Sequence, residues 1–150
     1  MFKKLSGGIF LLFISVLVLC LDACVLVPFI DSYKQIGVSE GDRQALLPKT
    51  LKKFQDFVYW GQYSNALAFA KEDEVMNIRE SLKRYKEIKI VSMKVDDILF
   101  EDDSKKATVD IVVSYYKIPQ YVVAKEKVRE VWEFSLSDWK IKERVMISEE

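Results

Sequence analysis

The sequence predicts an α+β fold, with three N-terminal helices packed on a curved, four-stranded antiparallel sheet. Between residues 42 and 86, apolar side chains recur every three or four residues, which is the spacing of one helix face. From Ile88 onward they alternate with polar side chains, as in strands that bury one face. Helices followed by a run of strands predict a single domain in which the helices cover one side of the sheet.

The first helix is predicted over residues 48–60. Pro48 suits the first helical position, and Gly61 suits the position past the end. A short extra turn before it is capped by Ser39 or Asp42. The predicted core face consists of Leu47, Leu51, Phe54 and Val58.

Two shorter helices follow. One is predicted over residues 64–71 with Ser64 as its cap, and the other over residues 73–85. The longer of the two begins with acidic residues and ends with basic ones, as the helix dipole favours. The core faces are Leu67 and Ala70 in the first, and Val75, Ile78, Leu82 and Tyr85 in the second.

Two strands with a turn at residues 101–104 come next. The first covers residues 88–100 and should contain a bulge near Ile90, because the apolar alternation changes phase there. The second alternates without a break until Pro119 ends it. Its predicted core face consists of Ala107, Val109, Ile111, Val113 and Tyr115.

The last two strands form a hairpin that turns at Ser137 and Asp138. The third strand centres on residues 128–136, and the charged residues 125–130 predict an exposed edge. Its core face is predicted to be Val128, Trp132, Phe134 and Leu136. In the last strand, the inward set is Trp139, Ile141, Val145 and Ile147, and the outward set is Lys140, Lys142 and Arg144.

The start of the chain has the order of a secretory leader. Two lysines precede a 13-residue apolar run (21 − 9 + 1 = 13), which ends in Leu21-Asp22-Ala23-Cys24. This ending resembles the lipobox of bacterial lipoproteins. The resemblance implies a signal peptide at 1–23, lipid attachment at Cys24, a connector at 24–41 and one domain at 42–150. An uncleaved anchor over residues 9–30 is the alternative, which Asp22 and the short run disfavour.

Composition excludes several classes of protein. Without residues 1–23 the chain keeps 21 basic residues (23 − 2) and 22 acidic ones (23 − 1), so nucleic acid is not an expected partner. It contains no histidine, and its two cysteines lie at positions 20 and 24. We therefore expect no metal site, no cofactor, no disulfide and no histidine-dependent nucleophile. Carboxylates, tyrosines and lysines remain for any catalysis.

The final hairpin carries a second resemblance. Residues 132–141 read Trp-Glu-Phe-Ser-Leu-Ser-Asp-Trp-Lys-Ile. Together with the helices-first order, this resembles the nuclear-transport-factor-2-like (cystatin-like cone) superfamily. That resemblance implies a curved sheet around a helix and a pocket between them. The superfamily includes isomerases, dehydratases and non-catalytic binding domains, but none of its catalytic residues can be matched here.

Four residues are candidates for ligand binding. Glu130 shares the phase of the core face and is predicted to lie beside Trp132, where loss of solvent would raise its pKa. Tyr115, Tyr116 and Tyr121 are predicted either to line an aromatic lip or to pack at a sheet corner.

Three functions remain open. The first is a non-enzymatic binding or accessory lipoprotein, anchored on the periplasmic side of the bacterial envelope, with the outer membrane favoured. Its partner would be an envelope protein or an apolar small ligand. The second is an isomerase or dehydratase that uses a carboxylate and a tyrosine. The third is a structural assembly lipoprotein, which a filled interior and an exposed apolar patch would favour.

Overall fold

The computed structural model describes residues 36, 37 and 39–149, and the side chains of these residues up to 148. They belong to one compact unit, Ile36–Glu150. The predicted signal peptide at 1–23, the lipid site at Cys24 and connector residues 25–35 lie outside the described residues.

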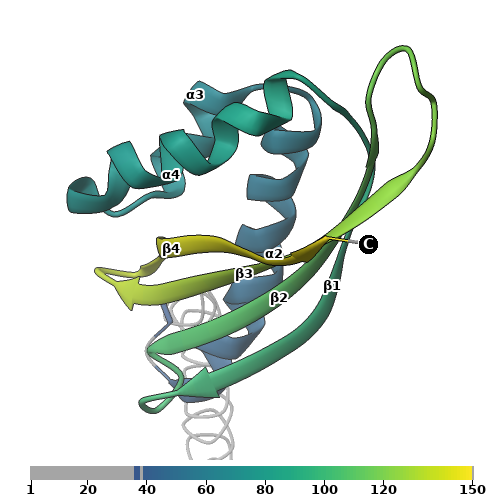
Figure 1. Cartoon of the computed structure of the whole chain (residues 1–150). Coiled ribbons are helices and arrows are strands. Elements are labelled where there is room, and N and C mark those ends of the chain that lie inside the picture. The colour runs from purple at the N-terminus through teal and green to yellow at the C-terminus, as the bar shows by residue number, and fades with distance from the viewer. Residues whose placement is uncertain (1–35, 38, 150) are drawn as a thin grey trace, which may run out of the picture. The chain divides into compact units, whose positions relative to one another are not determined.

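Four antiparallel strands form one sheet in the order β1-β2-β3-β4. They are β1 (Lys89–Glu101), β2 (Lys106–Tyr116), β3 (Ala124–Ser135) and β4 (Asp138–Glu149). Three α-helices precede them, α2 (Glu40–Tyr59), α3 (Tyr63–Ala66) and α4 (Val75–Lys83). Helix α2 contacts β1 and β4, and α4 lies across β4 (Figure 1). The α+β class and the four-stranded antiparallel sheet are thus confirmed.

Helix α2 begins earlier than predicted. The Ser39 hydroxyl accepts a hydrogen bond from the backbone N–H of Asp42 at 3.2 Å, and the Asp42 carboxylate accepts one from the backbone N–H of Ser39. This capping box confirms Ser39 as the predicted cap and starts the helix at Glu40. Pro48 lies inside the helix, so the predicted main start at Pro48 was wrong. The predicted core face is confirmed, since Leu47, Leu51, Phe54 and Val58 are buried.

The predicted second helix is mostly absent. α3 is a single turn, followed by a 3₁₀ turn at Leu67–Phe69. Ser64 lies inside α3 and does not cap it. The chain then bridges to the sheet, where the backbone N–H of Lys71 donates to the carbonyl of Ile141 at 3.0 Å. Pairing with β4 replaces helical hydrogen bonds here.

The bulge predicted near Ile90 is confirmed. The register with β2 shifts between Ile90 and Ser92, so Ile90 and Met93 both pair with core-facing residues. A second shift, between Val95 and Asp97, was not predicted. The unbroken alternation of β2 is confirmed, because its five predicted core residues are all buried.

Predictions for the last hairpin were partly wrong. β3 is an interior strand paired on both sides, so its charged start is not an edge. Leu136 lies in the turn itself, with Ser137, and both have a positive φ. In β4, Ile141 pairs with Trp132 and Glu143 pairs with Val131, which leaves Lys142 as a bulge. The phase therefore reverses, and Arg144 turns inward.

Hydrogen bonds connect the start of the described chain to the turn between β1 and β2. The Arg43 side chain donates hydrogen bonds to the carbonyls of Gly37, Asp103 and Ser104. The Trp139 indole N–H donates to the Arg43 carbonyl at 2.9 Å. Gly37 has a φ of +65°, and a Cβ atom there would collide with the Phe134 ring, so glycine is required.

Aromatic rings fill the interior between helix and sheet. Phe54 and Trp132 meet edge to face with centroids 5.5 Å apart, and Phe134 and Trp139 do the same at 5.5 Å. Trp132 is fully buried. The middle of the domain therefore holds a packed aromatic core. Buried polar side chains lie beside it in separate groups, Arg43 with Ser104 at the β1–β2 turn and Glu126, Glu130 and Arg144 on β3 and β4.

A buried charge cluster as the candidate functional site

Four polar side chains gather in the interior between β3, β4 and the end of α4. Glu126 and Glu130 come from β3, Arg144 from β4 and Tyr85 from the 3₁₀ turn Arg84–Lys86. All four are buried. We call this group the charge cluster.

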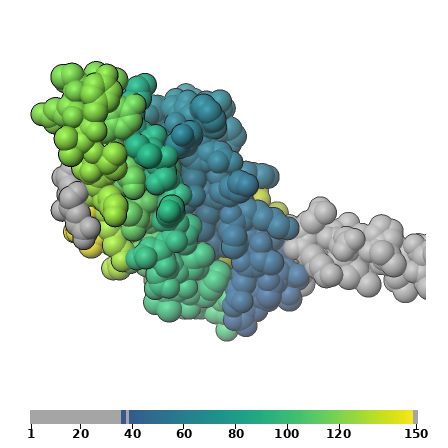
Figure 2. Space-filling model, turned by 90° about the vertical axis from the view of Figure 1, so that its right-hand side faces the viewer, coloured from purple at the N-terminus to yellow at the C-terminus, as the bar shows by residue number. Residues whose placement is uncertain are grey.

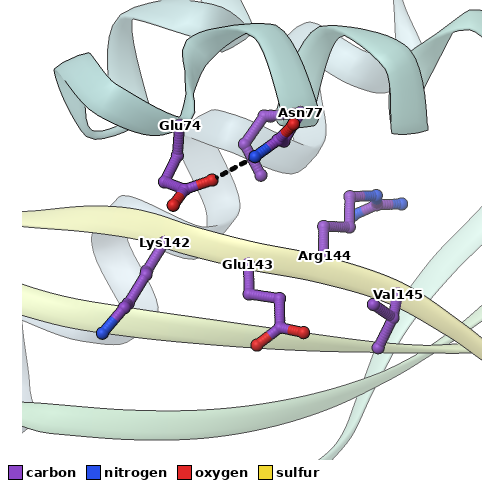
Figure 3. A pocket seen from close by; sticks show the side chains of 7 residues that line it. Glu74, Asn77, Lys142, Glu143, Arg144 and Val145 are labelled. Carbon is purple, nitrogen blue, oxygen red and sulfur yellow. Dashed lines mark hydrogen bonds between the residues drawn. The ribbon is translucent and has the colours of Figure 1, made fainter.

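The bulge at Lys142 creates the cluster. In Figure 3, Arg144 points away from the side to which Glu143 and Val145 point. Without the bulge, simple alternation from Ile141 would have placed Val145 inside, as predicted from the sequence, but it is 44% exposed.

Both carboxylate oxygens of Glu130 accept hydrogen bonds from the protein. Arg144 Nη1 donates to Oε1, and the Trp132 indole N–H donates to Oε2 at 3.0 Å. Burial raises the pKa of Glu130, while the Arg144 charge opposes this shift. The side chain faces the interior, but it lines none of the clefts described below. Its oxygens are occupied by protein donors.

Tyr85 and Glu126 form a pair that sequence reasoning did not find. The Tyr85 hydroxyl donates to Glu126 Oε1 at 2.5 Å and accepts from Arg144 Nη2 at 2.6 Å. Arg84 forms an ion pair with Glu126 Oε2 at 2.6 Å. Burial raises the pKa of the Tyr85 hydroxyl, and the Arg144 charge opposes this shift, so the hydroxyl stays protonated.

Arg144 lines two clefts, and Tyr85 also lines a third, of about 630 Å³, next to Trp60 and Lys89. The smaller Arg144 cleft, of about 180 Å³, opens beside Ser81 and Met146 and is lined by Tyr85, Glu126 and Arg144. The larger Arg144 cleft, of about 380 Å³, lies between α4 and β4, where Asn77 donates to Glu74 at 2.5 Å (Figure 3). The smaller cleft is below the roughly 300 Å³ at which ligand pockets usually begin.

The three candidate tyrosines do not form one lip. Tyr115 is buried in the core. Tyr116 follows it with the opposite orientation, and its ring centroid lies 5.7 Å from that of Tyr121. Tyr121 is exposed in the loop between β2 and β3. Only Tyr116 and Tyr121 can therefore share a ligand.

Within residues 36, 37 and 39–149, no group of three or more acidic side chains is arranged to hold a metal ion. In the same part of the chain, no helix is long and apolar enough to cross a membrane.

Comparisons with known proteins give a fold likeness. No family model matches the sequence, and no curated protein matches it. The domain is similar to the solution structure of a SEC-C motif containing protein from Rhodopseudomonas palustris, with a TM-score of 0.55 and 7% identity over 66% of this chain and 77% of that chain. It also matches the crystal structure of the intermembrane space region of the chloroplast protein ARC6, with a TM-score of 0.38 and 14% identity over 78% of this chain and 87% of that chain. The first likeness shows the fold alone.

Proposed function

We propose that this protein is a membrane-anchored lipoprotein of the bacterial cell envelope, whose domain is a non-enzymatic binding or accessory module. The leader and the lipobox-like Leu21-Asp22-Ala23-Cys24 support the anchor. Lipid on Cys24 would hold a cone-type domain, with three helices on a curved sheet, on the periplasmic side. The outer membrane is favoured over the inner.

The proposal that the domain is non-enzymatic rests on one observation, the pairing of the side chains of the charge cluster with one another. Both oxygens of Glu130 accept hydrogen bonds from the protein. In Glu126, Oε1 accepts a hydrogen bond from Tyr85, and Oε2, which is buried and accepts no hydrogen bond from the described residues, forms an ion pair with Arg84. A general base needs a free lone pair within reach of a substrate proton. Carboxylates paired in this way are better suited to fixing β3 and β4 against α4.

Intact mass of the protein purified from membranes tests the anchor. We expect a chain that begins at Cys24 and carries lipid, and we expect Cys24→Ser to lose membrane retention. A mass that keeps residues 1–23 without lipid would contradict the proposal, and so would unchanged retention of the Cys24→Ser variant.

An isomerase or dehydratase is the second candidate, and the Tyr85–Glu126 pair favours it. A tyrosine hydroxyl 2.5 Å from a carboxylate, at the wall of a cleft, can move a proton on a small carbonyl compound. The test is turnover of carbonyl substrates by the protein and by Tyr85→Phe, with Tyr121→Phe as control. Turnover lost only in a folded Tyr85→Phe variant would overturn the non-enzymatic proposal.

A structural assembly lipoprotein is the third candidate. The packed aromatic interior and the exposed apolar residues near position 120 favour it. Sedimentation of the purified protein decides this point, because an assembly role requires self-association or a co-purifying partner.

A further inference from the structure

One end of the domain carries an exposed apolar surface. Two aromatic residues at the end of α2 contribute to it, and the loop that joins β2 to β3 contributes the rest. Its members are between 43% and 72% exposed, and they are Tyr59, Trp60, Ile118, Tyr121, Val122 and Val123. We call these six residues the apolar tip.

The loop of the apolar tip projects beyond the sheet (Figure 1). In the space-filling view it forms one corner of the molecule, beside the start of β1 and α3 (Figure 2). Tyr121 lies against Tyr116, and Tyr116 pairs with Lys89 across the sheet. Lys89, Tyr59 and Trp60 line a cleft of about 630 Å³ at the end of α2. Both parts of the tip therefore lie at the end of the sheet where Lys89 and Tyr116 pair, and the loop is the part that projects.

Lysines surround the apolar tip. The two segments at this end, residues 86–89 and 117–125, contain four lysines and one glutamate, a net charge of +3 (4 − 1). All four are exposed, namely Lys86, Lys89, Lys117 and Lys125. Exposed tryptophan and tyrosine with aliphatic side chains, and lysines around them, are typical of surfaces that enter the interface of an anionic membrane.

We propose that the apolar tip docks on an anionic lipid membrane, with residues 118–123 among the headgroups and acyl chains and the lysines on the lipid phosphates. This inference rests on the proposed function and gives the anchored domain a second membrane contact. The projecting shape of the 118–123 loop favours lipid over a protein segment, because peptides usually bind in grooves (Figure 1).

The tether is long enough for this contact. Eleven residues lie between Cys24 and Ile36 (36 − 24 − 1 = 11), and the twelve Cα–Cα steps from Cys24 to Ile36 can span up to about 40 Å. The 20 residues of α2 measure about 30 Å, so the tip can reach the bilayer that holds the lipid. A tethered surface meets that bilayer at a high effective concentration, so even weak partitioning is sufficient.

Quenching of Trp60 fluorescence by brominated lipids tests the docking. The full-length protein is reconstituted in phosphatidylcholine vesicles with or without phosphatidylglycerol, both containing lipids brominated on their acyl chains. We expect quenching with the anionic lipid that decreases with added salt. Trp60→Phe should abolish the quenched signal, since Trp132 and Trp139 are buried.

Two matched variants locate the contact. Val122→Asp, in the tip, should remove the quenching, whereas Leu136→Asp should leave it unchanged. Leu136 is also exposed, and it lies in the β3–β4 turn, which is at the opposite end of the sheet from the β2–β3 loop. Lys117→Gln should weaken docking by about fivefold at low salt.

Other outcomes overturn the inference. Trp60 that is unquenched on anionic vesicles, or quenched equally in Val122→Asp, would show that the tip does not enter lipid. A photo-crosslinker at position 122 that labels a protein in cells, in place of lipid, would favour a protein partner. Intact mass separates the two proposals, because an unlipidated Cys24 with quenched Trp60 contradicts the lipoprotein but not the docking.

Discussion

Two ion pairs in this protein differ in their surroundings. Arg144 and Glu130 are both buried, so each has lost its hydration and depends on the other. Arg129 donates to Asp110 on the other face of the sheet at 2.7 and 2.9 Å; Asp110 is also buried, but Arg129 is 47% exposed and Lys127 lies 3.4 Å from the same carboxylate. Loss of Arg144 would leave Glu130 buried without its counter-charge, whereas loss of Arg129 would leave Asp110 with Lys127.

Arg144→Ala should lower the free energy of unfolding by about 3–5 kcal/mol, because Glu130 would remain buried without its counter-charge. Arg129→Ala should lower it by less than about 1 kcal/mol. Denaturant unfolding of both variants measures the difference. The double variant Arg144→Met with Glu130→Leu should recover most of the loss. Similar losses for Arg144→Ala and Arg129→Ala would contradict this view of the cluster.

Asp110 should contribute to the loss of folding stability at acidic pH. Its hydrogen bond with Arg129, together with one from Lys127, holds its pKa below the ordinary value. A lowered carboxyl pKa gives stability that is present above the unfolded-state pKa and is lost as pH falls through the folded-state value. The free-energy difference between the wild type and Asp110→Asn should therefore be largest near neutral pH and shrink below about pH 4. A free-energy difference between the two proteins that grows on acidification would contradict the lowered pKa of Asp110.

At the scale of elements, the alternation of apolar and polar residues predicts the buried face of a strand well where the strand has no bulge. β2 follows its pattern throughout, and all five predicted core residues are buried. β4 does not follow its pattern, because the bulge at Lys142 shifts the alternation by one residue, and the residue types around Lys142 do not indicate a bulge. That insertion places Arg144 inside and creates the charge cluster, of which only Glu130 had been selected as a site candidate. Tyr85 had been predicted only as a core residue.

The cap of α2 offers a direct test of helix boundaries. Ser39→Ala removes a side-chain acceptor for the first turn and should lower the free energy of unfolding by about 1 kcal/mol. Ser64→Ala is the matched control, because Ser64 was predicted to cap a helix and does not. It should change stability by less than about 0.5 kcal/mol. Thermal unfolding of both variants measures the effect, and equal shifts would contradict the observed boundaries.

At the scale of the whole molecule, we predict that the domain folds without a disulfide or a metal ion. The described residues include no cysteine and no histidine, and one compact unit covers Ile36–Glu150. A fragment with these bounds should unfold cooperatively without its leader. Neither a chelator nor a reductant should move its thermal midpoint. A fragment that unfolds gradually, with no defined midpoint, would show that residues before Ile36 belong to the core.

The bonds of Arg43 also determine how the domain would respond to mechanical force. A pull on the chain before Ile36 would first load Gly37, whose carbonyl accepts a hydrogen bond from Arg43. The same guanidinium also holds the carbonyls of Asp103 and Ser104, so the load would spread at once to the turn between β1 and β2. These hydrogen bonds share the tension and would have to rupture together. Stretching from the N-terminal side should therefore detach α2 from the sheet at a single high force, and not unwind the helix turn by turn.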